Sequence, residues 1–165
     1  MARAGKSRND MQDNAKQTSI GVLQGSLTDS IDLYTSTRQA HWNVKGSHFR
    51  GLHLMFEEFY TQVEKDIDEV AERLVQLGGT ATGTSQSVAA GTRLSAYPVE
   101  LKAGLGHVSA LLDRYVACAK TVREGIDEAD EAGDAGTADL LTNVVQNLDK
   151  AIWMLEATAT PTGEA

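Results

Sequence analysis

The sequence predicts an all-α protein, built as a four-helix bundle with one long crossover. Apolar residues recur at steps of three and four through four long segments, as they do on the buried stripe of an amphipathic helix. Residues 78–98, rich in Gly, Ser and Thr, separate the second segment from the third. No segment of consequence alternates as a β strand does. A length of 165 residues fits one domain.

The four segments can be bounded from their apolar stripes and their interruptions. The first spans about residues 10–42, and the second spans about residues 49–77, where a Gly-Gly pair ends it. The third follows Pro98 and the fourth begins near Thr137. We therefore expect the bundle to occupy residues 10–158, between a flexible tip at 1–9 and a flexible tail at 159–165.

The connection between the second and third segments is too long for a simple turn. We expect it to be an extended crossover that carries a short helix. Four long helices with a single long central connection are typical of ferritin-like bundles, whereas simple up-down-up-down bundles have only short loops.

The composition excludes several classes of protein. The net charge of -8 argues against a nucleic-acid-binding body, because a duplex carries dense negative charge. No apolar run approaches the roughly 20 residues needed to cross a membrane, and the first residues lack the apolar stretch of a secretory signal. The single cysteine, Cys118, cannot form an internal disulfide. We expect a cytoplasmic protein and leave association with the nucleoid open.

Polar residues on the second helical segment form a candidate metal site. At 100° per residue, His53, Glu57, Asp68 and Glu72 fall at about 0°, 40°, 60° and 100°, within one sector of the helix. Imidazole and carboxylate groups on one face suit iron, zinc or manganese. However, Glu57 and Asp68 lie roughly 16 Å apart along the axis, so one copy of the helix cannot close both pairs around one ion.

A two-fold axis removes this difficulty. Two antiparallel copies of a helix place residues opposite each other when their numbers have a constant sum, and the pairs 57/68 and 53/72 have equal sums. An axis near residues 62 and 63 would bring His53 and Glu57 of one subunit to face Asp68 and Glu72 of the other. His41, near the end of the first segment, could supply a further nitrogen beside His53. The spacing therefore predicts a metal site shared between subunits.

Two other interpretations compete with this one. Carboxylates on a helix usually form its solvated face, and we assign Glu64, Asp66 and Glu69 to such a face. A ferritin with its di-iron site inside one bundle needs two Glu-x-x-His motifs, and this chain contains none. The interior-site interpretation is therefore excluded.

The chain also resembles the Dps family of miniferritins over about residues 8–157. The resemblance rests on RQAHWNVKG at 38–46, LHLMFEEF, and DIDEVAERLVQLGG at 66–79. LSAYP at 94–98, DRYV at 113–116, and TADLL and NLDKAIWMLE in the last segment extend it. The pairing of HWN with the later AERxxxLGG is the most specific element.

This resemblance implies a site and an activity. The family's ferroxidase ligands would fall on His41, His53 and Glu57 of one subunit and on Asp68 and Glu72 of its dimer mate. The family most often has aspartate where this chain has Glu57, which puts the second metal position in doubt. Twelve such subunits would form a hollow shell that oxidises Fe(II), preferably with hydrogen peroxide, and stores the ferric product, with zinc as a substitute metal.

Trp42 follows the first candidate ligand directly and has two interpretations. It resembles the family's tryptophan near the site, which implies a role in electron donation during peroxide reduction. It could equally be a core aromatic residue.

The segment 124–139 holds seven carboxylates and no base, and we expect it to join the third and fourth helices. Its acids could be helix-end residues, with Asp134 or Thr137 as a cap. In a ferritin-like shell this corner surrounds a three-fold axis, where repeated carboxylates would form a negative funnel that draws in Fe(II). Asp130, Asp134 and Asp139 are the candidates for such an entry pore.

The N-terminal tip bears on whether the chain binds DNA. Arg3, Lys6 and Arg8 form a short basic cluster, which twelve subunits would multiply. The acidic body opposes such binding, so we expect DNA binding to be weak or indirect. One alternative is a nucleoid-compacting DNA-binding protein whose iron chemistry is secondary, but the short tip favours the ferroxidase. Another is a purely structural helical oligomer with an incidental zinc site.

Overall fold

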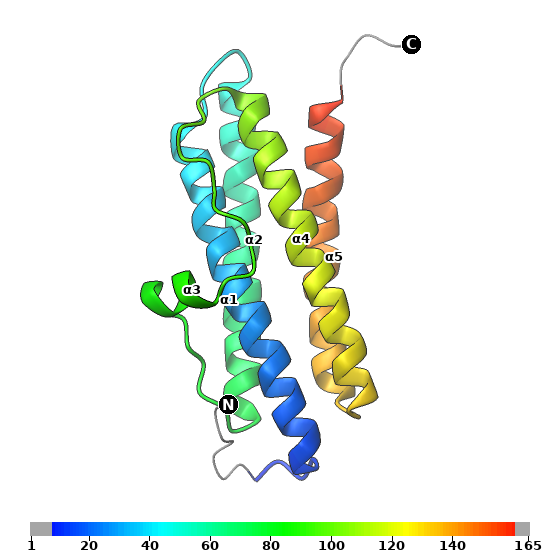
Figure 1. Cartoon of the computed structure of the whole chain (residues 1–165). Helices are drawn as coiled ribbons and strands as arrows, with labels where there is room; N and C mark the ends of the chain where they lie inside the picture. Colours follow the sequence, from blue (N-terminus) through cyan, green and yellow to red (C-terminus); the bar gives the residue numbers. More distant parts are fainter. Residues whose placement is uncertain (1–7, 161–165) are drawn as a thin grey trace.

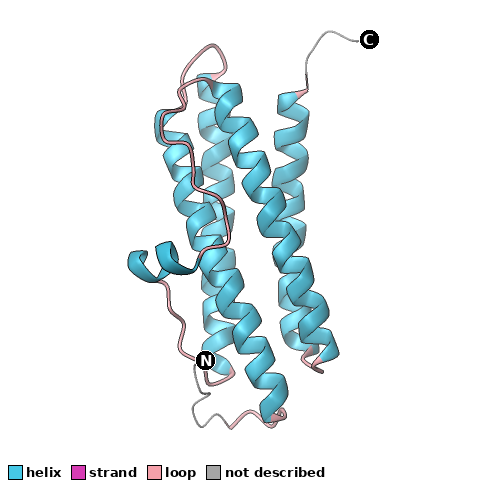
Figure 2. Ribbon diagram, viewed as in Figure 1, coloured by secondary structure: helices cyan, strands magenta, loops and turns pink. Residues whose placement is uncertain are grey.

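The structure, a computed structural model, describes residues 8–160 and consists there of five α-helices (Figure 1). These are α1 (Asp13–Asn43), α2 (Phe49–Gln76), α3 (Ser85–Gly91), α4 (Gly104–Glu131) and α5 (Ala135–Ala159). The described residues form no β strand, only one isolated bridge between Lys45 and Ala103 (Figure 2). The all-α prediction is confirmed. Within residues 8–160, no helix is both long enough and apolar enough to cross a membrane.

The four long helices pack as two pairs around one apolar core. α1 packs against α2, α4 packs against α5, and α1 also contacts α4. The core is made by the predicted apolar stripes, which place Leu23, Phe56, Leu111 and Leu141 fully out of solvent. The crossover returns the chain to the end of the bundle at which α2 starts (Figure 1). α4 therefore runs in the same direction as α2.

The end of α2 explains why two glycines stand there. Gly78 has a φ of 91°, a left-handed conformation that favours glycine. A Cβ on Gly79 would lie 2.5 Å from the Leu74 side chain, so a larger residue would clash. The pair therefore ends α2 at Gln76, one residue before the predicted end at about residue 77.

The crossover contains the expected short helix. α3 begins after Thr84, whose side-chain oxygen accepts a hydrogen bond from the backbone N–H of Ser87. From α3 the chain runs along the bundle to the start of α4 (Figure 1). This long connection has few buried apolar side chains, Val88 and Leu94 among them.

Two aspartates on α1 attach the crossover to the bundle. Asp29 is fully buried and accepts hydrogen bonds from the backbone N–H of Arg93 at 2.9 Å and from its Nε at 2.8 Å. Asp32 accepts a hydrogen bond from the Thr92 hydroxyl at 2.7 Å and pairs with the buried Arg114 guanidinium at 2.8 Å. Polar contacts therefore hold the crossover where apolar contacts are few.

The acidic segment differs from expectation. α4 continues to Glu131 and α5 begins at Ala135, so residues 132–134 alone form the connection. The prediction that 124–139 joins two helices is therefore wrong over most of its length. Its carboxylates up to Glu131 lie on α4, mostly on the exposed side, where acidic residues do not interrupt a helix.

We predict that Asp29→Ala loosens the crossover. The variant leaves the Arg93 backbone N–H and guanidinium without their shared acceptor, which should cost about 2–4 kcal/mol of stability. The midpoint of thermal unfolding should fall by several degrees, and limited proteolysis should cut the crossover sooner. Asp13→Ala is the matched control, because Asp13 is an exposed aspartate on the same helix. Equal unfolding curves for the two variants would contradict the anchoring role.

Candidate metal centre

The end of α1 and the start of α2 bring His41 and His53 into direct contact. Their rings are stacked with centroids 3.7 Å apart and an angle of 19° between the planes. The Nδ1 atom of His41 lies 2.8 Å from the backbone carbonyl of His53, and Nδ1 of His53 lies 2.8 Å from the carbonyl of His41. Each histidine is thus oriented by the backbone of the other.

This reciprocal contact decides which nitrogen of each ring is protonated. A carbonyl oxygen can only accept a hydrogen bond, so Nδ1 of both rings must carry the proton and donate. In the neutral imidazole the lone pair then resides on Nε2, the atom left for a metal ion. Backbone partners that fix the tautomer in this way are typical of histidines that bind metals.

Aromatic and charged side chains surround the histidine pair. The ring of Tyr60 meets the His41 ring edge-on at 5.3 Å. Burial, followed by the negative charge of Glu57, raises the pKa of Tyr60. The guanidinium of Arg38 lies over the rings of Tyr34, Tyr60 and Trp42 at 5.0 to 5.5 Å. The histidines therefore sit beside a group of aromatic rings, in which Tyr34 and Tyr60 meet edge-on at 6.0 Å.

The two remaining predicted ligands lie farther along the same helix. Glu57, Asp68 and Glu72 are all exposed on α2, whereas His53 is half-buried and His41 is 9% exposed. Within residues 8–160 of one chain, no group of three or more His, Cys, Asp or Glu side chains is close enough to hold a metal ion. One subunit brings His41 and His53 together but does not bring Asp68 or Glu72 to them.

Trp42 is not a core residue. Its side chain is 61% exposed and packs on Arg38, with the guanidinium carbon 5.0 Å from the ring centroid. The core-aromatic interpretation is therefore wrong. Trp42 directly follows His41 and lies at the surface on the last turn of α1.

Comparisons with known proteins place the chain in a family. Residues 20–162 match the model of the ferritin family, described as a ferritin-like domain. The DNA protection during starvation protein of Agrobacterium fabrum (strain C58) is 47% identical over 152 residues, which cover 92% of this chain and 94% of that protein. The chain belongs to the Dps family.

Solved structures agree with this assignment. The chain matches a Dps protein from Bacillus brevis with a TM-score of 0.85 and 31% identity, covering 91% of this chain and 100% of that one. A Dps protein from Vibrio cholerae O1 matches with a TM-score of 0.87 and 27% identity, covering 95% of this chain and 99% of that one. The latter is described as a member of a broad superfamily of ferritin-like diiron-carboxylate proteins. The predicted Dps resemblance and ferritin-like fold are confirmed.

One residue of this Dps chain departs from its expected place. Asp66, which we assign to the solvated face from sequence, is only 3% exposed and lies between α2 and α5. Burial raises its pKa to about 6. Helical periodicity places position 66 on the core side of α2. Three buried residues share this side: Phe59 seven positions earlier, Val63 three positions earlier and Val70 four positions later.

Sequence reasoning singled out Trp42 but not the neighbouring Tyr34, Arg38 and Tyr60. Tyr34, Arg38 and Trp42 follow one another at steps of four on α1 and so share one face, and Tyr60 faces them from α2. The steps of four that lead back from Trp42 were a usable signal for Arg38 and Tyr34. Nothing local marks Tyr60, because its position depends on how α2 packs on α1.

Asp134 makes its contacts within the subunit, at the start of α5. It is the N-cap of α5 and accepts a hydrogen bond from the Thr137 backbone N–H at 3.0 Å. Its carboxylate also pairs with Arg73 of α2 at 2.7 Å, and its side chain is 1% exposed. The capping interpretation is confirmed, and this burial removes Asp134 from the pore candidates, whereas Asp130 and Asp139 are exposed.

We predict a pH-dependent contribution of Asp134 to stability. Burial alone would raise the pKa of Asp134, but hydrogen bonds from Thr137 and the charge of Arg73 lower it below its ordinary value. A lowered folded-state pKa means that its stabilisation is complete above about pH 5 and is lost as the pH falls through the folded pKa. Asp134→Ala should therefore lower the unfolding midpoint at neutral pH, and the difference from wild type should shrink in acid.

Thermal unfolding followed by circular dichroism over a pH series measures this difference. Asp130→Ala is the control, since Asp130 is an exposed aspartate at the end of α4. If the difference in unfolding midpoint between Asp134→Ala and wild type grew toward low pH, the predicted pH dependence would be wrong.

Proposed function

We propose that this Dps protein is a ferroxidase that also stores iron, with its reaction centre shared across a two-fold interface. His41, His53 and Glu57 of one subunit would bind Fe(II) together with Asp68 and Glu72 of the partner subunit. The observation that carries the proposal is the reciprocal His41–His53 contact, which directs two Nε2 lone pairs away from the backbone. A contact that only packed two rings would not need both Nδ1 atoms to be satisfied by backbone carbonyls.

The outer face of α2 supports a partner subunit at this place. Phe49, Leu54 and Val75 are 45%, 40% and 54% exposed there. At 100° per residue, Val75 shares its angle with Glu57, and Leu54 shares its angle with Glu72. Apolar side chains among the proposed ligands favour burial against a second copy. The equal sums of 57/68 and 53/72 give the register in which that copy would supply its carboxylates.

The donor set suits iron as the substrate. Imidazole nitrogen and carboxylate oxygen bind Fe(II), and the oxygen donors stabilise the higher charge of Fe(III). The two histidine rings are stacked with centroids 3.7 Å apart, and their Nδ1 atoms are taken up by backbone carbonyls. Each ring would therefore offer its Nε2 atom to iron. Zinc could occupy the same donors without redox chemistry.

The proposed reaction uses hydrogen peroxide as oxidant. Two Fe(II) ions each give one electron to one peroxide molecule, which becomes two hydroxide ions. Trp42, which follows His41 and is exposed against Arg38, would donate the second electron when only one iron is present. Removing ferrous ion and peroxide together prevents the radical reaction between them.

Storage requires a closed shell with an entrance for Fe(II). We propose a dodecamer in which the α4–α5 corner surrounds a three-fold axis. Asp130 and Asp139 are exposed at this corner, and three copies of each would make a negative path for the cation. Asp134 would stabilise the corner from within rather than line the path.

Protection of DNA would then be mainly chemical. The Agrobacterium relative is named for DNA protection during starvation. In this chain the net charge of -8 opposes direct contact with DNA, and of the basic tip Arg8 is exposed while Arg3 and Lys6 lie outside the described residues. We therefore propose a cytoplasmic shell with weak, salt-sensitive DNA binding, and rank nucleoid compaction second.

Mixed assembly tests whether the centre is shared. Neither His41→Ala/His53→Ala chains nor Asp68→Ala/Glu72→Ala chains should retain ferroxidase activity alone. In shells refolded from equal amounts of both, roughly a quarter of the sites should again be complete, because half of the interfaces pair unlike subunits and each such interface has one intact centre. Stopped-flow absorbance of ferric product measures the recovery.

The control for this experiment is Glu69→Ala, which removes an exposed carboxylate of α2 outside the proposed ligand set. It should leave activity unchanged. Mass spectrometry of intact shells must show both chains in one particle. Verified mixed shells with no more activity than their parents would rule out a shared centre.

The oxidant is tested by comparing two electron acceptors. Fe(II) should be oxidised faster by hydrogen peroxide than by dioxygen at matched concentrations, with about two Fe(II) consumed per peroxide. Stopped-flow absorbance gives the rates, and peroxide titration under anaerobic conditions gives the ratio. A clear preference for dioxygen would point to ordinary ferritin chemistry instead.

A further inference from the structure

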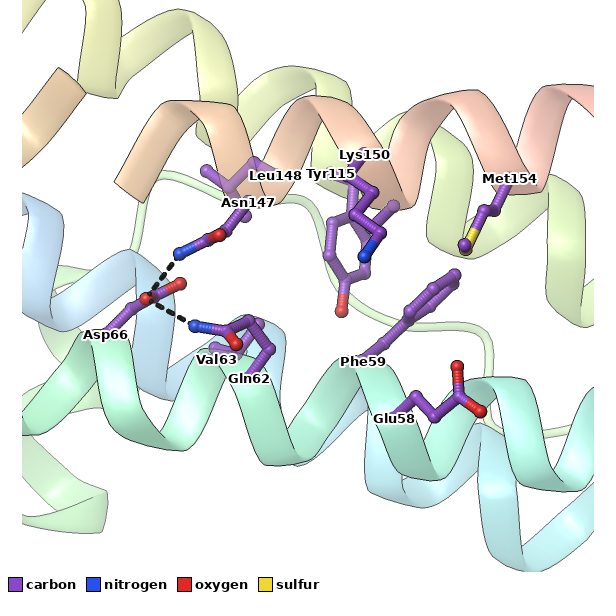
Figure 3. A pocket seen from close by; sticks show the side chains of 11 residues that line it. Glu58, Phe59, Gln62, Val63, Asp66, Tyr115, Asn147, Leu148, Lys150 and Met154 are labelled. Carbon is purple, nitrogen blue, oxygen red and sulfur yellow. Dashed lines mark hydrogen bonds between the residues drawn. The ribbon is translucent and has the colours of Figure 1, made fainter. Parts of the chain in front are cut away.

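The bundle contains a cavity between α2 and α5 that plays no part in the proposed iron chemistry. It has a volume of about 220 Å³. At 100° per residue, its lining residues on α2 lie on the side of the helix opposite the proposed ligands. Figure 3 shows the side chains around it. Its deep walls are apolar or aromatic and come from three helices: Phe59, Val63, Tyr115, Leu148 and Ala151. Met154 is half-buried, and two exposed charged residues, Glu58 and Lys150, stand where the cavity meets the surface.

Asp66 gives this cavity its chemistry. The side chain is 3% exposed, and its Oδ1 accepts hydrogen bonds from Gln62 Nε2 at 3.0 Å and from Asn147 Nδ2 at 2.9 Å (Figure 3). Its other oxygen, Oδ2, is equally buried and has no hydrogen-bond partner among residues 8–160. A buried carboxylate oxygen without a donor destabilises the fold, so a molecule that donates to Oδ2 would be bound favourably.

The shape and donor set favour an organic cation over a metal ion. Asp66 is the one carboxylate of the buried walls, and Glu58 lies eight residues earlier on α2, roughly 12 Å along the axis. The cavity is also far larger than the roughly 30 Å³ that one water molecule occupies. Apolar walls with one buried charge at one end are the lining expected around a short hydrocarbon chain with a charged head.

We propose that this cavity binds a small aliphatic ammonium ion. The Asp66 side chain would turn so that Oδ2 meets the cavity and accepts a hydrogen bond from the ammonium N–H groups. The hydrocarbon part would lie against Phe59, Val63 and Met154. Because Asp66 stands about 220° around α2 from His53, this site is separate from the ferroxidase face, and its occupancy can be tested without iron.

Lys150 is the competing amine within the chain. It lines the mouth of the cavity, but no ion pair within 4.0 Å joins it to Glu58 or Asp66 in the described part of the chain. Its positive charge would repel a second ammonium group at the mouth. Lys150→Met should therefore strengthen binding, and weaker binding in this variant would contradict the proposal.

The probe is n-butylammonium, compared with n-butanol, which has the same hydrocarbon chain and no charge. Isothermal titration of the assembled protein near neutral pH should give one n-butylammonium per subunit. Asp66→Asn keeps an acceptor for Gln62 and Asn147 but loses the charge, so the affinity should fall roughly tenfold or more. n-Butanol should bind more weakly and equally to both proteins.

Glu64→Gln is the matched control, since Glu64 is an exposed acid on the same helix, and it should leave probe binding unchanged. Ala151→Val narrows the cavity from α5 and should weaken both probes, which keeps the test valid if Asp66→Asn does not assemble. No binding by the wild type, or equal binding by Asp66→Asn, would overturn the proposal. The proposal would also be overturned if Mg²⁺ or Mn²⁺ bound in a manner that depends on Asp66 and n-butylammonium did not bind.

Discussion

The buried carboxylate of Asp29 is the contact on which the arrangement of the bundle depends. α2 is about 42 Å long at 1.5 Å per residue, and the crossover must return over most of that distance before α4 can begin. That segment has few apolar side chains to anchor it, so Asp29 holds it through the backbone N–H and side chain of Arg93. Because this return makes α4 parallel to α2, α1 and α4 pack together and the outer face of α2 stays uncovered within the subunit.

α2 then carries two different chemistries on opposite sides. Its outer side bears Glu57, Asp68 and Glu72 in solvent, while its inner side bears buried Asp66 beside a cavity. The cavity lies at the seam between α2 and α5, which contact each other less closely than the helices within each hairpin. A polar group is tolerated at this seam because Gln62 and Asn147 satisfy one of its oxygens.

Features that depend on local periodicity could be predicted from the sequence. The apolar stripes place the long helices within a few residues of their bounds, and the long polar connection predicts the crossover with its short helix. The contacts of Asp29 with Arg93 and of Asp66 with Asn147 could not be predicted, because these residues lie far apart in the chain and meet only after packing. The acidic composition of residues 124–139 led to the wrong prediction of a connection there, because acidic residues cluster on an exposed helix face as readily as in a loop.

The division of the proposed centre between subunits has a physical consequence. A single subunit already orients His41 and His53, so this half of the centre loses little conformational entropy when iron binds. It lacks the two carboxylates of the partner subunit, and its own Glu57 alone would supply little of the oxygen coordination that stabilises Fe(III). Oxidation would therefore begin only after the interface forms, at a site that belongs to an assembled shell. In the proposed centre, assembly would thus be linked to chemistry: the folded monomer would be prepared for the reaction but would not be competent to carry it out.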